Sequence, residues 1–219
     1  MLKTADLFDL SHTKAASLLE KTEYPWEALG SIRDFILALG KMLPAEEYQQ
    51  QGEDVWIARD AVIFPNNYIS GPCIIGHETE VRPGAFIRGS ALIGDRCIIG
   101  NSTELKNCIL FDNVQVPHYN YVGDSILGYK SHMGAGAVTS NVKSDKTPVA
   151  VRCGDEKTET GLRKMGAMLG DYAEIGCSSV LNPGTIIGRN ASVYPLSSVR
   201  GTVPENHICK GDRGIFPRK

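Results

Sequence analysis

Two basic residues and one histidine are notable for their spacing. Arg88 and Lys106 are eighteen residues apart, and His118 follows Lys106 by twelve. In a chain that coils with eighteen residues per turn, Arg88 and Lys106 stack on one corner, about 4.8 Å apart, and His118 stacks over Gly100. Two stacked cations favour a bridging anion such as phosphate, although the same spacing allows both side chains to point apart into solvent. A histidine that titrates near neutral pH can accept a proton from a nucleophile.

A hydrophobic repeat with a period of six indicates such a coil. Every sixth residue over 57–117 belongs to one apolar series: Ile57, Ile63, Ile69, Ile75, Val81, Ile87, Ile93, Ile99, Leu105, Phe111 and Pro117. This period fits neither an amphipathic helix nor a lone strand. Glycine often follows the apolar residue, as at Gly76 and Gly94, and suits a tight corner. A small residue usually stands four positions after the apolar one, so three hexads can close a triangular coil around a thin core.

The repeat resembles that of the hexapeptide-repeat family of left-handed parallel β-helices. We therefore expect an all-β protein, a left-handed parallel β-helix with a short N-terminal α-helical cap. The predicted boundaries are a helical cap at 1–50, a β-helix at 51–205 with an inserted loop at 142–165, and a tail at 206–219. Helices are expected near 12–20 and 26–43, packed across the open N-terminal end of about seven coils, because an uncapped coil exposes strand edges.

Composition restricts the possible partners and the location. The net charge of −2 over 219 residues gives no support to a nucleic-acid or anionic-membrane surface. No apolar run reaches the length of a membrane span, and two aspartates in the first twelve residues disfavour a signal peptide, so a cytoplasmic location is expected. The six cysteines form no C-x-x-C pair. Buried free thiols are favoured over disulfides or zinc ligands.

Between residues 103 and 141 the repeat changes, because Lys106, Asp112 and His118 replace corner glycines. This stretch resembles the C-terminal acetyltransferase half of the bacterial bifunctional N-acetylglucosamine-1-phosphate uridylyltransferase and glucosamine-1-phosphate acetyltransferase. The motifs that carry the resemblance are Glu104-x-Lys106, His118-x-x-Tyr121-x-Gly123-Asp124, Gly134-Ala135-Gly136 and Asn141. It implies acetyl transfer from acetyl-CoA to an amino-sugar phosphate, toward UDP-N-acetylglucosamine, in clefts of a homotrimer and without a metal.

The resemblance also implies roles for individual residues. His118 matches the general base, and Glu104 and Asn141 complete the catalytic group, with Asn141 at the sugar amine. Matches to phosphate ligands are Lys106, Tyr121 and Lys164, the last on a loop. Gly134, Ala135 and Cys177 match positions beside the thioester and the pantetheine arm. The chemistry requires a base for the amine and fixed N–H donors for the oxyanion.

Some positions depart from the family pattern. The Arg-Pro-Gly-Ala motif begins at Arg82, one hexad before the position that stacks under Lys106, so Arg88 is favoured as the phosphate ligand and Arg82 stays an alternative. His132 stands where the family has an asparagine at the substrate. The first fifty residues contain no glycine-rich nucleotide loop, so uridylyl transfer is not expected.

Three other functions remain open. The chain could be a non-catalytic assembly or regulatory module, like the β-helical tails of sugar nucleotidyltransferases. It could be a hexapeptide O-acetyltransferase, although a cationic corner favours an acceptor that bears phosphate. A carbonic anhydrase of the same fold needs three histidines around zinc, and His77, His118 and His132 lack the paired spacing of that class.

Overall fold

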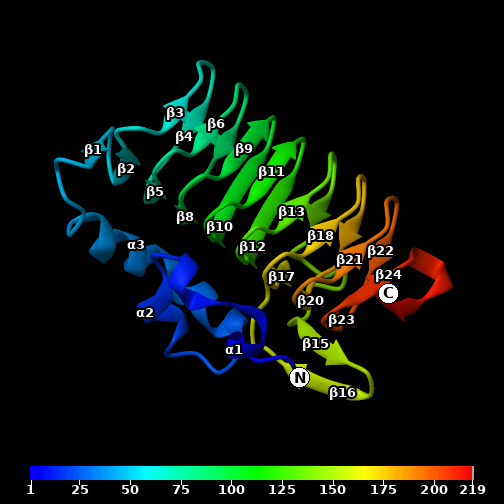
Figure 1. The fold of residues 1–219 in the computed structure, drawn as a ribbon. Coiled ribbons are helices and arrows are strands. Elements are labelled where there is room, and N and C mark those ends of the chain that lie inside the picture. Colours follow the sequence, from blue (N-terminus) through cyan, green and yellow to red (C-terminus); the bar gives the residue numbers. More distant parts are fainter. Residues whose placement is uncertain (219) are drawn as a thin grey trace.

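The computed structural model describes residues 1–218, and most of them form one stack of coils (Figure 1). The expected all-β, left-handed parallel β-helix is confirmed. Each coil contributes a short strand to each of three faces. The first face contains β2 (Val55–Ala58), β5 (Cys73–Ile75), β8 (Ala91–Ile93), β10 (Glu104–Leu110), β12 (Tyr121–Leu127), β17 (Ala167–Leu169), β20 (Thr185–Ile187) and β23 (Thr202–Val203).

The other two faces are built in the same way. The second contains β3 (Val62–Ile63), β6 (Glu80–Val81), β9 (Ile98–Asn101), β11 (Gln115–His118), β13 (His132–Met133), β18 (Glu174–Ile175), β21 (Ser192–Val193) and β24 (His207–Cys209). The third contains β4 (Tyr68–Ile69), β7 (Phe86–Ile87), β14 (Val138–Thr139), β19 (Val180–Leu181) and β22 (Ser198–Val199), together with the first residues of β10 and β12. The long strands β10 and β12 therefore turn a corner and serve two faces.

Strand register shows that the coils differ in length. Val55 pairs with Cys73, eighteen residues on, whereas Leu105 pairs with Val122, only seventeen residues on. Leu127 pairs with Leu169 across the insertion. The second face has eight parallel strands where the hexad count predicts seven coils, because β24 continues the stack past the boundary expected at residue 205.

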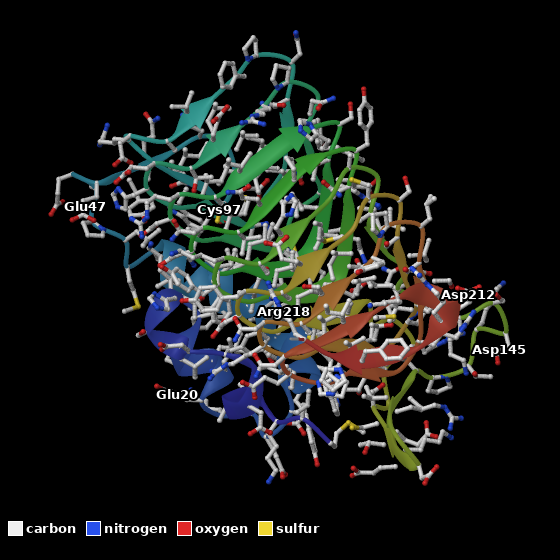
Figure 2. All side chains as sticks on the ribbon, turned by 45° about the vertical axis from the view of Figure 1, so that its right-hand side comes forward. Glu20, Glu47, Cys97, Asp145, Asp212 and Arg218 are labelled. Atoms are coloured by element: carbon white, nitrogen blue, oxygen red, sulfur yellow. The ribbon has the colours of Figure 1, made fainter. Side chains whose placement is uncertain are left out.

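The inward side chains form a continuous core. Ile75, Ile93 and Leu110 are fully buried, as are the small inward residues Cys73 and Cys97. Cys97 lies inside the stack (Figure 2), and burial raises its pKa to about 12. All six cysteines are free thiols, as expected. Cys73, Cys97, Cys108 and Cys209 are buried, Cys153 is half-buried and Cys177 is exposed.

The corner glycines are required by the next coil. A Cβ on Gly94 would lie 2.6 Å from Asp112 Oδ1, and that oxygen accepts a hydrogen bond from the backbone N–H of Asp95 at 2.8 Å. Gly76 has the same relation to Asp95, which accepts from His77 N at 2.9 Å. The missing side chain therefore leaves room for an aspartate of the next coil. That carboxylate accepts a hydrogen bond from the backbone N–H of the residue after the glycine.

The N-terminal segment is helical, but it does not lie where we expected. Its helices are α1 (Thr4–Leu7), η1 (Leu10–His12), α2 (Ala16–Leu19), η2 (Pro25–Ser31) and α3 (Ile32–Gly40). They lie along the side of the stack, with α3 packed against β5, β8 and β10 and η2 against β12 (Figure 1). The prediction that they close the N-terminal end is therefore wrong.

The reason is that the first face is apolar on its outer side. Strand residues alternate inward and outward, so Ile74, Leu92 and Ile109 point away from the core, yet each is at most 1% exposed. Ile32 and Ile36 of α3 are buried on the same side. Burial of apolar area drives the helices onto this face.

The insertion forms a hairpin, as expected for a projecting loop. Strands β15 (Ala150–Cys153) and β16 (Glu156–Glu159) pair antiparallel, and β15 packs against β20 and β23. At the two ends of the stack, β1 (Tyr48–Gln50) and β25 (Ile215–Pro217) add antiparallel strands to β2 and β24. Within residues 1–218 no helix has both the length and the apolar character needed to cross a membrane.

Candidate active site

The predicted site residues gather at the two corners that border the third face. We call one the Lys106 corner. Strand register stacks Arg88, Lys106, Gly123, Ser140, Asn182 and Arg200 there in successive coils, and Asn107, Asp124 and Asn141 each lie one residue further along. The other is the His118 corner, which carries Asn101, His118, Ala135, Cys177 and Leu196. Strand β12 begins at Tyr121, near the His118 corner, and reaches the Lys106 corner at Asp124. Three residue steps, about 10 Å, separate the two corners.

Asp124 is the centre of the Lys106 corner. Its side chain is 7% exposed and accepts hydrogen bonds from the Asn107 amide at 2.9 Å, from the Asn141 amide, and from Lys106 Nζ at 3.5 Å. The Asn107 amide also reaches Leu29 O at 3.3 Å, which ties the corner to η2. A buried carboxylate with three donors is well compensated, and it fixes the orientation of its partners.

Lys106 and Arg88 do stack in consecutive coils, as the spacing predicts. Arg88 N donates to Leu105 O at 2.9 Å, and Arg88 Nη1 donates to Glu104 Oε1 at 2.7 Å. Each cation therefore has a carboxylate partner, Glu104 or Asp124. The protein therefore supplies carboxylates that offset both charges, and a bridging phosphate stays a prediction. Glu104 belongs to this corner, and its ion pair is with Arg88 rather than with His118.

Tyr121 extends along the third face toward the Lys106 corner. Its hydroxyl accepts a hydrogen bond from the Asn141 amide at 3.1 Å, and a Cβ on Gly123 would lie 2.4 Å from that hydroxyl. Gly123 is therefore required for the ring to lie flat across the strand. Burial of the ring, together with the negative charges of Asp124 and Glu104, raises the pKa of Tyr121, so its hydroxyl stays protonated near neutral pH.

His118 lies on the opposite corner, with its side chain exposed. The seventeen-residue coil places it over Asn101 rather than over Gly100, which corrects the predicted stacking. His118 Nδ1 lies 3.1 Å from Asn101 Oδ1. An amide oxygen only accepts hydrogen bonds, so this contact requires a proton on Nδ1 and leaves the lone pair of Nε2 free. The imidazole is thus oriented to accept a proton at Nε2.

Asn120 fastens the His118 corner to the next coil. It is 2% exposed, and its amide donates to Gly134 O at 2.8 Å and to Ala137 O at 3.0 Å, while its oxygen accepts from His118 N at 3.0 Å. Ala135 O in turn accepts from Ser178 N at 2.8 Å. The backbone N–H groups of Ala135 and Cys177 donate to no group within residues 1–218. Ala135, one coil on from His118, and Cys177, two coils on, thus have backbone donors without a partner in this part of the chain.

The His118 corner continues into a cavity of about 560 Å³. Leu196 N donates to Cys177 O at 2.9 Å, which carries the corner one coil further. The cavity is lined by Leu196, by the basic residues Lys210 and Arg213, and by the acidic residue Asp212.

Three predicted residues lie outside these two groups. Arg82 donates to Glu80 Oε1 at 2.9 Å on the second face, so the structure places Arg88, not Arg82, beside Lys106. His132 Nδ1 lies 2.9 Å from Glu174 Oε2, three residues along the strand from the Ala135 position. Lys164 is exposed, and the next residue, Met165, donates its N–H to Asn141 O at 3.0 Å, which brings the lysine close to the Lys106 corner.

Some contributing residues were not selected from the sequence. The motif that contains Asp124 predicts no role for it, and the repeat does not single out Asn101, Asn107 or Asn120. The sequence did contain a weak indication of these residues, because polar side chains occupy positions of the hexad near the stretch where the repeat changes. Among residues 1–218 there is no group of three or more His, Cys, Asp or Glu side chains that could hold a metal ion.

The chain has recognisable relatives. Residues 69–154 match the family model described as the GMPPB C-terminal domain. A protein named bifunctional protein GlmU from Methanococcus maripaludis is 32% identical over 202 residues, covering 90% of this chain and 48% of the relative. A bifunctional sugar-1-phosphate nucleotidylyltransferase/acetyltransferase from Sulfurisphaera tokodaii is 30% identical and covers 83% of this chain and 42% of the relative. The chain thus spans less than half the length of these relatives.

A solved structure, Francisella novicida UDP-N-acetylglucosamine acyltransferase, is 16% identical, covers 75% of this chain and 66% of its own, and superposes with a TM-score of 0.49. The fold assignment rests on the strand register described above. By fold and repeat, the chain is a hexapeptide-repeat, left-handed β-helix protein. It is a homologue of the bifunctional GlmU proteins, and the resemblance drawn from residues 103–141 is confirmed.

Proposed function

We propose that the protein is an acetyl-CoA-dependent N-acetyltransferase that acts on an amino-sugar phosphate such as glucosamine-1-phosphate. The observation that carries the proposal is the position of His118. Its Nδ1 is held by Asn101, its Nε2 is free, and it shares a corner with the unpaired backbone donors of Ala135 and Cys177. The relatives named as nucleotidylyltransferase/acetyltransferases support the same reaction class.

The residues divide the chemistry between the two corners. His118 Nε2 takes a proton from the acceptor amine as its nitrogen attacks the thioester carbonyl. The Ala135 or Cys177 N–H stabilises the oxyanion that develops on that carbonyl. The C–S bond then breaks, and the proton on His118 passes to the departing CoA thiolate. Lys210 and Arg213, further along the corner, bind phosphate groups of the CoA nucleotide.

The Lys106 corner binds the acceptor phosphate. Lys106 and Arg88 now contact Asp124 and Glu104, and the Arg88–Glu104 pair is exposed to solvent, where ion pairs contribute little to stability. A phosphate can therefore displace Glu104 from Arg88 at little cost. Tyr121, neutral near pH 7 and oriented by Asn141, supplies a further donor to the acceptor, and Lys164 approaches from the returning loop.

The decisive experiment measures thiol release from acetyl-CoA with glucosamine-1-phosphate. We expect activity in the wild type and a loss of about 10²- to 10⁴-fold in His118→Ala, because general base catalysis contributes that much. His77→Ala is the matched control, since His77 is paired with Asp60 away from the corner. Equal activity in wild type and His118→Ala would refute the assignment of the base. An inert wild type that still binds acetyl-CoA would indicate another acceptor, whereas no binding would favour an assembly module.

We also propose that the protein assembles as a homotrimer. The first coils expose large apolar side chains on the faces that border the His118 corner, with Tyr68 60% and Val62 51% exposed. Flat triangular sides that carry such residues pack around a three-fold axis, and closed symmetry gives three equal clefts. Sedimentation should give about three times the 23.8 kDa chain mass, and a stable monomer would contradict this assembly.

A further inference from the structure

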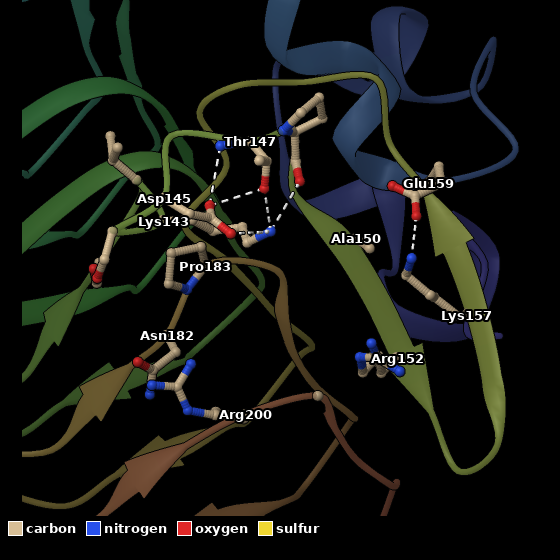
Figure 3. A pocket seen from close by; sticks show the side chains of 15 residues that line it. Lys143, Asp145, Thr147, Ala150, Arg152, Lys157, Glu159, Asn182, Pro183 and Arg200 are labelled. Carbon is tan, nitrogen blue, oxygen red and sulfur yellow. Dashed lines mark hydrogen bonds and ion pairs between the residues drawn. The ribbon is translucent and has the colours of Figure 1, made fainter.

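A second cavity lies on the Lys106 corner, beyond the residues assigned to the acceptor. It has a volume of about 650 Å³ and opens between the hairpin β15–β16 and the coil ends that carry Asn182 and Arg200 (Figure 3). Ser140 and Val142, on either side of Asn141, also line it. The cavity lies at the opposite edge of the third face from the His118 corner.

The wall formed by the hairpin is fixed to the coils. Thr202 Oγ1 donates to Arg152 O at 2.7 Å. Gly184, with φ +81°, approaches so closely that a Cβ there would lie 2.8 Å from Ala150 O, and Gly201, with φ +75°, lies against Arg152. These two glycines adopt backbone conformations that other residues disfavour, and they let β15 lie directly on the corner. The hairpin wall of the cavity is therefore held against the coils.

The charges around the cavity are unbalanced. Lys143 pairs with Asp145 at 3.5 Å, and Lys157 pairs with Glu159. Arg152 and Arg200 also line the cavity, and neither forms an ion pair with a carboxylate within residues 1–218. Figure 3 shows Arg200 beside Asn182 and Arg152 on the facing strand, so the two guanidinium groups come from opposite walls. The whole chain is slightly acidic, so two uncompensated arginines here are a local concentration of positive charge.

We propose that this cavity binds a small molecule through a phosphate group held by Arg152 and Arg200. Guanidinium groups present planar pairs of N–H donors that match phosphate oxygens, and unpaired arginines keep those donors free. Neither residue takes part in the acetyl transfer proposed above, so the site stands independently of that reaction. The phosphate belongs either to a larger acceptor that reaches past Asn141 or to a separate nucleotide.

Isothermal titration with inorganic pyrophosphate, without acetyl-CoA, tests the proposal. We expect the double variant Arg152→Gln/Arg200→Gln to raise the Kd at least about tenfold, the loss expected for hydrogen bonds to a charged group. Lys21→Gln/Lys41→Gln removes the same charge from exposed positions on the N-terminal segment and should change the Kd less than about twofold. Arg152→Lys/Arg200→Lys keeps the charge but not the planar donors and should bind at an intermediate level.

Pyrophosphate binding that is equal in the wild type and the double arginine variant would overturn the proposal, as would a wild type that does not bind. Both arginines are exposed, so the variants should unfold at the wild-type temperature, which circular dichroism checks. Competition identifies the source of the phosphate. Displacement of pyrophosphate by glucosamine-1-phosphate would indicate the acceptor, whereas displacement only by UDP would indicate a separate nucleotide. Because acetyl transfer is not measured, failure of the proposed reaction leaves this test intact.

Discussion

The two corners of the third face are held together in different ways. At the Lys106 corner, side chains bind side chains: the buried Asp124 carboxylate holds Lys106, Asn107 and Asn141. At the His118 corner the histidine side chain is exposed, and Asn120 holds the backbone of the corner to the next coil. One corner thus fixes its polar side chains through a buried carboxylate, and the other leaves an imidazole exposed.

This difference shows how a regular solenoid can carry a site. The repeat fixes where each corner lies, and the polar residues that interrupt it decide what each corner does. Substitutions at the Lys106 corner should therefore affect both stability and acceptor binding. Substitutions at the His118 corner should affect turnover with little effect on stability.

The largest effect is expected for Asp124→Ala. It removes the buried carboxylate that three half-buried donors share, and it should lower the free energy of unfolding by about 2–4 kcal/mol. Glu104→Ala removes the carboxylate of an exposed ion pair and should lower the free energy of unfolding far less. Urea denaturation followed by circular dichroism measures both. Equal losses would show that Asp124 is no more important to the corner than a surface carboxylate.

Lys106→Gln should weaken acceptor binding. Loss of one charged donor to phosphate should raise KM for glucosamine-1-phosphate about tenfold and leave kcat nearly unchanged. Arg82→Gln is the control, because Arg82 pairs with Glu80 away from this corner. If Arg82→Gln raised KM and Lys106→Gln did not, the phosphate site would lie on the second face instead.

Asn101→Ala tests the positioning of His118. Without the amide oxygen, Nδ1–H is no longer fixed, and kcat should fall about two- to tenfold while stability is retained. Asn101→Asp keeps the acceptor and adds a negative charge, which favours the imidazolium. Its pH–rate profile should shift toward higher pH. An unchanged profile in Asn101→Asp would indicate that Asn101 does not act on the imidazole.

The smallest effect concerns the corner between the first and second faces, where Asp112 lies. Burial raises its pKa above the ordinary value of 3.8. Asp112 therefore has a higher pKa in the folded protein than in the unfolded chain. Its contribution to stability falls as the pH rises from the unfolded-state pKa through the folded-state pKa, and it is restored as the pH falls. Asp112→Asn keeps an oxygen for Asp95 N–H and should flatten this dependence in melting curves at pH 4–7. A steeper dependence in the variant would contradict the assigned cause.

The fold was predictable because its determinants are local and periodic. The hexad series ending at Pro117 and the glycines at positions 76 and 94 are visible in the sequence, and each follows from the need for one apolar and one compact residue per side. The inserted hairpin was predictable from the loss of the repeat. The stacking of Lys106 over Arg88 followed from the eighteen-residue coil.

The errors all concern contacts between segments that are distant in sequence. The coil shortens to seventeen residues, which moved His118 from Gly100 to Asn101. The N-terminal helices pack along the side of the stack because the outer surface of the first face is apolar, at Ile74, Leu92 and Ile109. Counting hexads in the sequence does not reveal this surface.

The sequence by itself determined the β-helix and which residues lie at its corners. Both follow from the hexad repeat, which closes one coil about every eighteen residues. Only the tertiary structure decided which side chains pair. Glu104 binds Arg88, Asp124 binds Lys106, and Arg200 meets the inserted hairpin that carries Arg152. Those pairings depend on one-residue changes in coil length and on where the hairpin docks, and a one-residue shift gives each corner residue a different neighbour.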